Sequence, residues 1–275
     1  NLATNGAYMV IKPGTHTLRI RYWVRDVATG IEGTITKIIP SHTFAKNEYV
    51  NMEADLQVKN YDGDNYYMWD AQEQYWKGYE WTKNLPGNTG QQTLNGYPSP
   101  NYPRSNTDPR YWNESYPGDR VSNPAIHSCK DLPNVNEMTW YAAKGDPHSD
   151  RDELWTTMGH LYKGGVWLKK KSQISGFNAN TAVDGSDWRI TTKYQNFPES
   201  QTLPSAADAN NYFYLPLIGY YESGDLYRVG HYTFYWSSSA NPRNRNSAYS
   251  LYVDLGALYV GDSYRYFGFK VGGFE

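Results

Sequence analysis

The stretch that decides the fold runs from Ala248 to Val260 and reads Ala-Tyr-Ser-Leu-Tyr-Val-Asp-Leu-Gly-Ala-Leu-Tyr-Val. Large apolar residues alternate with Ser, Asp and Tyr, which is the period-two pattern of half-buried strands, and Leu255-Gly256 interrupts it as a turn. One face would be buried and carries Tyr249, Leu251, Val253, Leu258 and Val260. The other face would point outward and carries Ser250, Tyr252, Asp254, Ala257 and Tyr259.

Five residue types are missing around this meander. The segment from Ser237 to Phe269 contains no Lys, Glu, Gln, Met or Trp, although these types account for 48 of the 275 residues of the chain. Ser, Asn, Tyr, Gly, Arg and Asp dominate instead, a composition close to that of an antibody paratope. The tail is therefore predicted to be a recognition surface. A solvated β-meander without any ligand would have a similar composition and is the alternative.

The charge balance argues against two classes of partner. With 26 basic and 28 acidic residues, the formal net charge is -2. A chain so balanced lacks the electrostatic footprint that nucleic acid or an anionic membrane requires. The chain contains 27 Tyr and 10 Trp, which suit surfaces that bind sugars or proteins.

The sequence predicts no catalytic residues, no metal ligands and no cofactor. Cys129 is the only cysteine, which excludes an intrachain disulfide and a cysteine zinc cluster. His148 and His160 have no obvious third ligand, and Ser237 lies in no nucleophile elbow. Asp150, Asp152 and Glu153 are expected to stabilise the first turn of a helix. We therefore expect a protein that is not an enzyme.

The N-terminal part of the chain, residues 1–75, is predicted to form strands. Residues 18–25 alternate apolar and basic side chains, and a second strand is expected at residues 34–39, stopped by Pro40. A weaker extended pattern covers residues 49–58. These strands are too few for a complete domain and are predicted to close a β-sandwich whose other strands lie elsewhere. An exposed edge of such a fragment would allow strand addition.

Two helices are predicted after an irregular segment at residues 86–122. Asn134 and Glu137 form a capping box, and Gly145 would end the first helix. Ser149 or Asp150 would cap the second, which ends at Gly164-Gly165. Its apolar residues at helical spacing are Leu154, Trp155, Met158, Leu161 and Tyr162. Strands are expected at residues 166–169, 188–192 and 212–216, followed by a run of short strands.

Two family resemblances accompany these patterns. Thr17-Leu-Arg-Ile-Arg-Tyr-Trp-Val-Arg, Ile35-Thr-Lys-Ile-Ile-Pro and Tyr67-Met-Trp-Asp-Ala resemble the end of a fimbrillin-type pilin or surface lipoprotein of Bacteroidales-like bacteria. From residue 87 onward, Leu132-Pro-Asn-Val-Asn-Glu-Met, Leu161-Tyr-Lys-Gly-Gly, Tyr214-Leu-Pro, Gly219-Tyr-Tyr, Tyr235-Trp-Ser-Ser-Ser and Arg265-Tyr-Phe-Gly-Phe resemble the C-type-lectin-like major-paralogous-domain family.

Within that family, the tail is similar to the variable proteins of diversity-generating retroelements. Those systems turn AAC codons into NNC codons, which cannot encode Lys, Glu, Gln, Met or Trp. The resemblance thus accounts for the five missing types. It implies an α+β fold, in which a C-type-lectin-like ligand-display domain with two helices and short antiparallel strands (residues 76–275) follows the closing strands of a fimbrillin-type β-sandwich (residues 1–75). Residues 271–275, Val-Gly-Gly-Phe-Glu, depart from the Val-Arg pair with which the family usually ends.

The resemblance also implies which residues vary and bind ligand. The positions that look diversified are Arg243, Arg245, Ser247, Ser250, Tyr252, Asp254, Ala257, Tyr259, Asp262, Ser263, Tyr264, Tyr266 and Phe267. The positions that look like fixed scaffold are Trp236, Ser237, Ser238, Gly256, Arg265, Gly268 and Phe269. A calcium site of the sugar-binding lectins is not supported, because residues 241–243, Asn-Pro-Arg, supply only one oxygen ligand.

These expectations describe an extracellular adhesin at the cell surface or pilus tip of a Gram-negative bacterium. The chain starts at Asn1 without a signal-like segment and has no apolar run long enough to cross a bilayer, so we expect a mature or truncated ectodomain with no membrane span. Its partner would be a protein or glycan on another cell or a phage, with pilus subunits contacting the N-terminal strands. The alternatives are a pilus structural subunit without its own ligand, and a carbohydrate-binding or carbohydrate-active protein whose pocket holds paired carboxylates.

Overall fold

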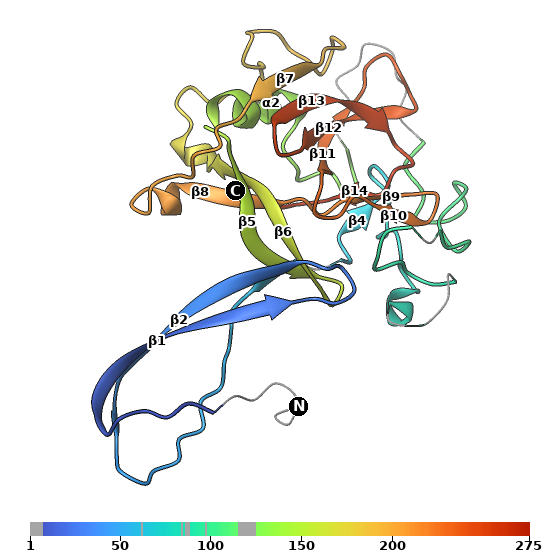
Figure 1. Ribbon diagram of the computed structural model, residues 1–275. Coiled ribbons are helices and arrows are strands. Elements are labelled where there is room, and N and C mark those ends of the chain that lie inside the picture. Colours follow the sequence, from blue (N-terminus) through green and yellow to red (C-terminus); the bar gives the residue numbers. More distant parts are fainter. Residues whose placement is uncertain (1–7, 62, 84, 86–88, 97, 115–124) are drawn as a thin grey trace. The chain divides into compact units, whose positions relative to one another are not determined.

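The computed structural model describes the chain except for residues 1–7, 62, 84, 86–88, 97 and 115–124 (Figure 1). It divides into two compact units, Asn1–Val58 and Lys59–Glu275. Residues 59–75, expected with the N-terminal strands, belong to the second unit, where Tyr66, Trp69 and Tyr75 are fully buried.

The first unit is a long two-stranded ribbon. Strand β1 (Gly14–Arg25) pairs antiparallel with β2 (Glu32–Phe44), and within the described residues no other strand joins them. The expected strand stop at Pro40 is wrong. The register shifts opposite this segment, between His16 and Leu18, and a proline without an N–H is tolerated at such an irregularity on an edge strand. The weak extended pattern at residues 49–58 forms no strand.

A six-stranded sheet contains the C-terminal meander. Figure 1 shows β11, β12 and β13 side by side. The strand order is β4 (Tyr66–Tyr67), β14 (Phe269–Lys270), β11 (Thr233–Ala240), β12 (Ser247–Val253), β13 (Ala257–Tyr264) and β7 (Gln195–Pro198). The predicted turn at Leu255-Gly256 is confirmed, because β12 ends at Val253 and β13 begins at Ala257. Strand β13 continues without a turn through Asp262 and Ser263 to Tyr264.

Two smaller sheets complete the second unit. The four-stranded sheet has the order β3 (Lys59–Asn60), β5 (His148–Thr157), β6 (His160–Lys169) and β8 (Tyr212–Pro216), and the two-stranded sheet pairs β9 (Tyr220–Glu222) with β10 (Asp225–Tyr227). The strands predicted at residues 166–169 and 212–216 are confirmed within β6 and β8. The strand predicted at residues 188–192 is absent, and a turn at residues 188–190 followed by irregular backbone occupies that segment.

The second predicted helix is wrong, because its residues form the β5–β6 hairpin. Met158 (φ 52°) and Gly159 (φ 84°) make a two-residue turn with both central residues in the left-handed region, the geometry that suits a tight hairpin. Trp155 and Tyr162 have a spacing that equals two helical turns, but they are also directly opposite across the hairpin. Their rings stack at 5.3 Å. The apolar spacing therefore fitted both structures.

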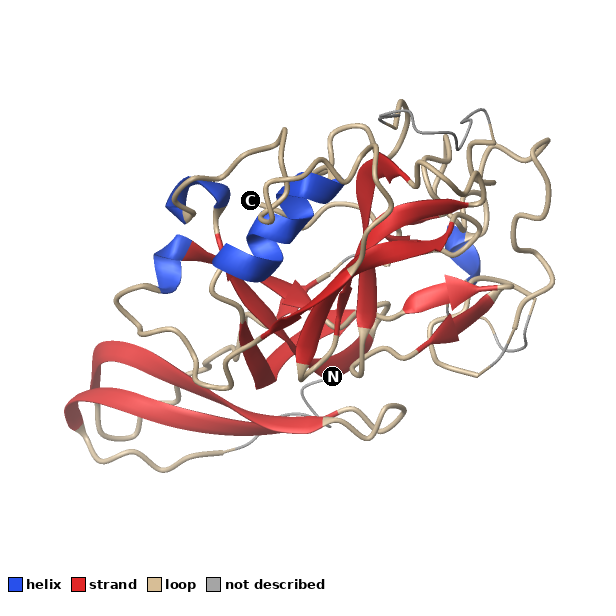
Figure 2. Ribbon diagram, turned by 90° about the horizontal axis from the view of Figure 1, so that it is seen from above, coloured by secondary structure: helices blue, strands red, loops and turns tan. Residues whose placement is uncertain are grey.

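The first predicted helix is confirmed as α2 (Val135–Lys144), with Asn134 and Glu137 forming the capping box and Gly145 the C-cap. It packs against β6, β7, β11, β12 and β13, and Figure 2 shows it beside the strands. The short 3-10 helices are η1 (Glu80–Thr82), η2 (Lys171–Gln173) and η3 (Ala209–Asn211). Of the irregular segment expected at residues 86–122, residues 86–88, 97 and 115–122 lie outside the described part, and the rest contains no helix or strand.

The expected α+β architecture with two helices is therefore wrong, and with it the C-type-lectin-like fold class. The described residues contain one α-helix and a sheet-rich second unit. The predicted β-sandwich fragment is a two-stranded ribbon in the described residues. The misassignment came from the hairpin at residues 148–169, where hydrophobic spacing alone could not separate helix from strand.

The six-stranded sheet is covered on both faces at one end. The main core packs against the face that carries Tyr249, Leu251 and Val253, all fully buried. A second cluster covers part of the opposite face and consists of Trp69, Ala125, Cys129, Trp236, Ala240, Ala248 and Phe269. Consequently only part of the predicted outward face reaches solvent.

No helix in the described part of the chain combines the length and the apolar character needed to cross a bilayer.

Candidate functional site

The candidate site is the full set of positions predicted to vary, from Arg243 to Phe267, here called the display face. These residues lie on β12, on β13 and in the segments that flank them. Four are exposed (Arg243, Arg245, Tyr264 and Tyr266), seven are half-buried (Tyr252, Asp254, Ala257, Tyr259, Asp262, Ser263 and Phe267), and two are buried (Ser247 and Ser250). The prediction that these residues point outward therefore matches the observed exposure for only part of the set.

The pairing of β12 with β13 brings the central residues of the display face together. Tyr252 lies opposite Tyr259, and the hydroxyls of Ser250 and Ser263 are 3.1 Å apart. Asp254 organises the turn, because its carboxylate accepts a hydrogen bond from the backbone N–H of Ala257 (3.0 Å) and one from the Tyr252 hydroxyl (3.1 Å). Asp262 pairs with Tyr249, which places it on the face of β13 opposite to the face of Tyr259 and Ser263.

The second core cluster explains why Ser250 is only 2% exposed. Ser250 lies opposite Trp236 and two positions after Ala248, and both of those residues belong to the cluster. Ser247 is buried at the start of β12, where its carbonyl accepts a 2.9 Å hydrogen bond from Arg265 Nε. Larger side chains at these two positions would have to displace packed atoms.

Asparagine side chains hold the loop that carries the two predicted arginines. Asn241 Oδ1 accepts hydrogen bonds from the backbone N–H groups of Arg243 (2.8 Å) and Asn244 (3.1 Å), and Asn244 Nδ2 donates to Ser247 Oγ (2.9 Å). The side chains of Arg243 and Arg245 are exposed. The loop conformation therefore depends on its asparagines, while the arginines project from it.

Arg265 is a buried support beneath this loop. Its guanidinium lies 4.4 Å from the ring centre of Trp69 and 5.6 Å from that of Trp112. Its backbone N–H donates to the Asn246 carbonyl (2.9 Å), so the residue connects the 264–267 turn to the arginine loop. The other residues predicted as scaffold are also buried, except for Gly256.

A chain of ring contacts connects the two ends of the display face. Tyr264 stacks on Tyr266 at 5.2 Å, and Tyr266 contacts Phe267 at 4.8 Å. The contacts continue from Phe267 to Phe269, from Phe269 to Phe234 and from Phe234 to Tyr252, with ring centroids 4.4–5.7 Å apart. Exposed and half-buried rings thus rest on a rigid aromatic base.

Three phenols of the display face, those of Tyr252, Tyr259 and Tyr266, are neutral at physiological pH. Burial raises the pKa of Tyr252, Tyr259 and Tyr266 above the ordinary value of 10.0, and nearby Asp254 adds to the effect at Tyr252. Neutral phenols both donate and accept hydrogen bonds. Contacts made by these residues would therefore not depend on phenolate formation.

Sequence reasoning missed several aromatic residues beside the display face. Tyr232 and Phe234 contact Tyr252 at 5.4 and 4.9 Å, and Tyr194 lies 6.2 Å from Tyr259. These three residues precede the segment that lacks the five residue types, so composition did not mark them. The alternation at residues 232–236, Tyr-Thr-Phe-Tyr-Trp, was the available signal.

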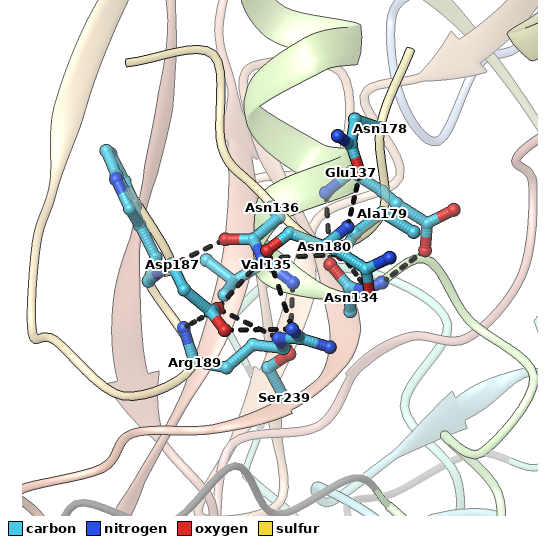
Figure 3. A network of polar contacts seen from close by, with 11 residues as sticks. Asn134, Val135, Asn136, Glu137, Asn178, Ala179, Asn180, Asp187, Arg189 and Ser239 are labelled. Carbon is cyan, nitrogen blue, oxygen red and sulfur yellow. Dashed lines mark hydrogen bonds and ion pairs between the residues drawn. The ribbon is translucent and has the colours of Figure 1, made fainter. Parts of the chain in front are cut away.

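A polar network supports the sheet from the side of α2 (Figure 3). The fully buried Asn136 donates from Nδ2 to Asp187 (2.9 Å) and accepts at Oδ1 from the backbone of Trp188 (2.9 Å). Asp187 also accepts from Arg189 through both oxygens at 2.8 Å. Burial acts to raise the pKa of Asp187, but the hydrogen bonds from Arg189 and Asn136 outweigh it and lower that pKa.

Residues 192 and 193, which follow Arg189 along the chain, contact residues that support the display face. Thr192 Oγ1 donates to Asn241 Oδ1 at 3.3 Å, and the backbone of Lys193 donates to the Tyr249 hydroxyl at 3.3 Å. Asn241 is the residue that shapes the arginine loop. The network therefore anchors the loop that carries Arg243 to the α2 side of the sheet.

The acidic cluster of β5 has a structural role different from the predicted one. Asp150 Oδ1 accepts hydrogen bonds from the backbone N–H groups of Asp152 and Glu153, both at 3.0 Å, and these residues form a bulge in a strand. They do not begin a helix. His148 contacts Asp146 at 3.4 Å. Within the described residues, no group of three or more His, Cys, Asp or Glu side chains is arranged to hold a metal ion.

Comparison with protein-family models, curated proteins and solved structures gave no match for this chain.

Proposed function

We propose that this chain is a cell-surface or pilus-tip adhesin, and that the display face is its diversified ligand-binding surface. The mechanism is non-covalent recognition of a protein or glycan on another cell or phage. The proposal rests on the tail composition and its resemblance to the variable proteins of diversity-generating retroelements, and it does not depend on the two-helix fold.

The main support for the proposal is that burial separates the positions that look diversified from the positions that look fixed. All the positions that look diversified are exposed or half-buried except Ser247 and Ser250, whereas all those that look fixed are buried except Gly256. A surface that tolerates sequence change needs side chains that leave the core untouched, on a backbone held by other residues. The buried Arg265 and Phe269 fit that second role.

The chemistry of the display face suits recognition of varied ligands. Tyr264 and Tyr266 are 49% and 37% exposed and stack on each other, so they offer contact area with little loss of side-chain entropy. Arg243 and Arg245 can make forked hydrogen bonds to carboxylates or carbonyl groups. In this proposal the N-terminal strands attach the display unit to pilus subunits or to a tethered stalk.

Deep sequencing of the gene, including the part that encodes residues 237–269, in a growing population of the native host tests the proposal. We expect substitutions at adenine-derived positions between Ser237 and Phe269, concentrated on the exposed and half-buried residues. Ser247 and Ser250 are expected to accept mainly small residues, because both are buried.

An unvarying tail in that population would count against diversification and favour a fixed adhesin or a pilus structural subunit. Substitutions spread evenly along the whole gene would contradict the proposal, because they would show ordinary drift.

A further inference from the structure

A cavity of about 440 Å³ lies in the second unit, beside the four-stranded sheet and separate from the display face. Its lining comes from β3 and the residue that follows it, from β5, from β6 and the residue that follows it, from β8, and from residues 273–275. This volume falls within the range of roughly 300–1,000 Å³ typical of small-molecule sites. None of its lining residues belongs to the display face.

Aromatic side chains form the walls of the cavity. Trp167 and Tyr214 meet at 4.8 Å with their planes tilted by 50°, and Tyr61 lies 6.5 Å from Tyr214. The Trp167 indole N–H donates to Asp150 Oδ2 at 3.1 Å, which fixes the orientation of the ring. Gly165 is required here, because a Cβ at that position would lie 2.5 Å from the Tyr214 hydroxyl. Contacts within the chain thus hold the walls in place.

Residues 273–275 complete the cavity and are firmly attached. The Phe274 ring packs against Tyr141 at 5.4 Å and Tyr235 at 5.9 Å. The carbonyl of Glu275 accepts hydrogen bonds from the Lys171 backbone (2.9 Å) and the Tyr141 hydroxyl (3.1 Å).

The charges around the cavity balance. Lys59 and Lys170 oppose Glu153 and Glu275, Lys170 pairs with Glu275 at 3.1 Å, and the Lys59 ammonium lies 4.7 Å from the centre of the Tyr61 ring. A net-charged ligand would meet as much repulsion as attraction. A neutral ligand would find both donors and acceptors on the rim.

The Tyr214 side chain forms part of the cavity wall. The residue is 8% exposed, and its hydroxyl has no hydrogen-bond partner among the described residues. Buried hydroxyl groups normally have a partner, because an unmade hydrogen bond costs stability. The hydroxyl oxygen is itself buried beside Gly165, so a ligand in the cavity would contact the Tyr214 ring and not this hydroxyl.

We propose that this cavity binds a pyranose unit of a neutral saccharide. A pyranose has an apolar C–H face that can stack on Trp167 and hydroxyls that both donate and accept, which matches aromatic walls with a charge-balanced rim. The site is independent of the display face, so the adhesin would have two separate recognition surfaces. The proposal concerns binding only.

Saturation-transfer difference NMR on the full chain tests the site. The probes are the methyl α- and β-pyranosides of glucose, galactose, mannose and N-acetylglucosamine, with tetramethylammonium as a cationic probe. We expect transfer to the ring protons of at least one pyranoside, with a Kd on the order of millimolar for so small a ligand. Trp167→Ala should weaken that binding at least about tenfold, because it removes the stacking wall.

The controls separate the cavity from other aromatic surfaces. Trp81→Ala removes a tryptophan that is 75% exposed and outside the cavity, and Tyr259→Ala removes a ring of the display face. Both should bind the pyranoside as the wild type does. Tyr61→Ala replaces Trp167→Ala if the latter does not fold, as judged by near-ultraviolet circular dichroism.

Three results would overturn the proposal. The first is no transfer to any pyranoside from folded wild-type protein, and the second is transfer to tetramethylammonium alone. The third is pyranoside binding that the cavity variants leave unchanged or that Tyr259→Ala abolishes. Failure here would leave the proposed display function untouched, because gene sequencing tests that function separately.

Discussion

Arg265 shows how one buried residue can connect two segments of the display face. It is fully buried, lies over Trp69 and donates from Nε to the Ser247 carbonyl. A guanidinium is planar and can stack and donate at the same time, whereas an ammonium cannot reproduce that geometry. The residue therefore holds the start of β12 and the 264–267 turn together.

We predict that Arg265→Lys lowers the free energy of unfolding by about 2–4 kcal/mol, because it leaves a buried cation with poorer partners. Urea denaturation followed by tryptophan fluorescence would measure the loss. Arg245→Lys, at an exposed position, is the matched control and should be nearly neutral. Equal effects of the two substitutions would refute the supporting role of Arg265.

Glu199, which follows β7, is a carboxyl group whose ionisation affects the stability of the fold. Burial raises its pKa from the ordinary 4.5 to about 7, and the Asp254 carboxylate adds to that rise, while Ser149 and Arg151 offset part of it. Neither of its oxygens makes a hydrogen bond of standard geometry within the described residues. The folded chain therefore holds this proton more tightly than the unfolded chain does.

The sign of the pH effect follows from that difference. Between pH 4.5 and 7 the folded state binds more protons at Glu199, so this residue lowers the unfolding free energy as pH rises through that window. Glu199→Gln should raise stability at pH 8 by about 1 kcal/mol, after allowance for the part of the side chain that remains exposed.

Urea denaturation at pH 4, 6 and 8 would measure the effect, with Glu53→Gln at an exposed position as the control. If the difference in unfolding free energy between the wild type and Glu199→Gln did not change with pH, the raised pKa of Glu199 would be contradicted.

At the scale of elements, the β5–β6 hairpin depends on its two-residue turn. Gly159 has φ 84°, a conformation in which a Cβ is unfavourable. We predict that Gly159→Ala lowers the unfolding free energy by about 1 kcal/mol. Gly256→Ala is the control, because Gly256 is exposed, has ordinary backbone geometry and leaves 3.5 Å to the nearest side-chain atom.

Urea denaturation of both glycine variants would give the two values. If Gly256→Ala proved as harmful as Gly159→Ala, the left-handed turn would not be the cause. A neutral Gly159→Ala would be inconsistent with the hairpin and would reopen the helical interpretation of residues 150–162.

At the scale of the whole molecule, a diversified surface requires that many side chains change without loss of the fold. Arg243, Arg245, Tyr264 and Tyr266 are exposed. Replacing all four by Ser is therefore predicted to change the Tm by less than about 3 °C, because surface substitutions usually cost little. Ser250→Tyr should lower the Tm by about 5 °C or more, because it overpacks a buried site.

Thermal unfolding monitored by near-ultraviolet circular dichroism would compare the two variants. A quadruple variant that melts far below the wild type would argue that the display face is part of the core, as a subunit interface would be. A well-tolerated Ser250→Tyr would show that the second core cluster does not confine that position.

The sequence by itself determined the local features whose signals come from near neighbours along the chain. The alternation in residues 248–260 identified the strands and buried face of the meander, and the capping box at Asn134 identified α2. The capping box is a hydrogen bond to nearby backbone, and side chains alternate between the two faces of any extended strand. Neither pattern needs knowledge of distant contacts. The division of the tail into varying and supporting residues stays a prediction from composition and resemblance.

Only the tertiary structure decided what depends on residues far apart in the chain. Trp155 and Tyr162 have a spacing that fits either a helix or a hairpin, and sheet pairing selected the hairpin. Ser250 lies on the outward face by alternation but is buried by a cluster that includes Trp69, which is distant in the sequence. The cavity lined by Tyr61 and Trp167 is likewise assembled from distant segments. Long-range packing overrides local pattern because burial depends on which segments meet in space.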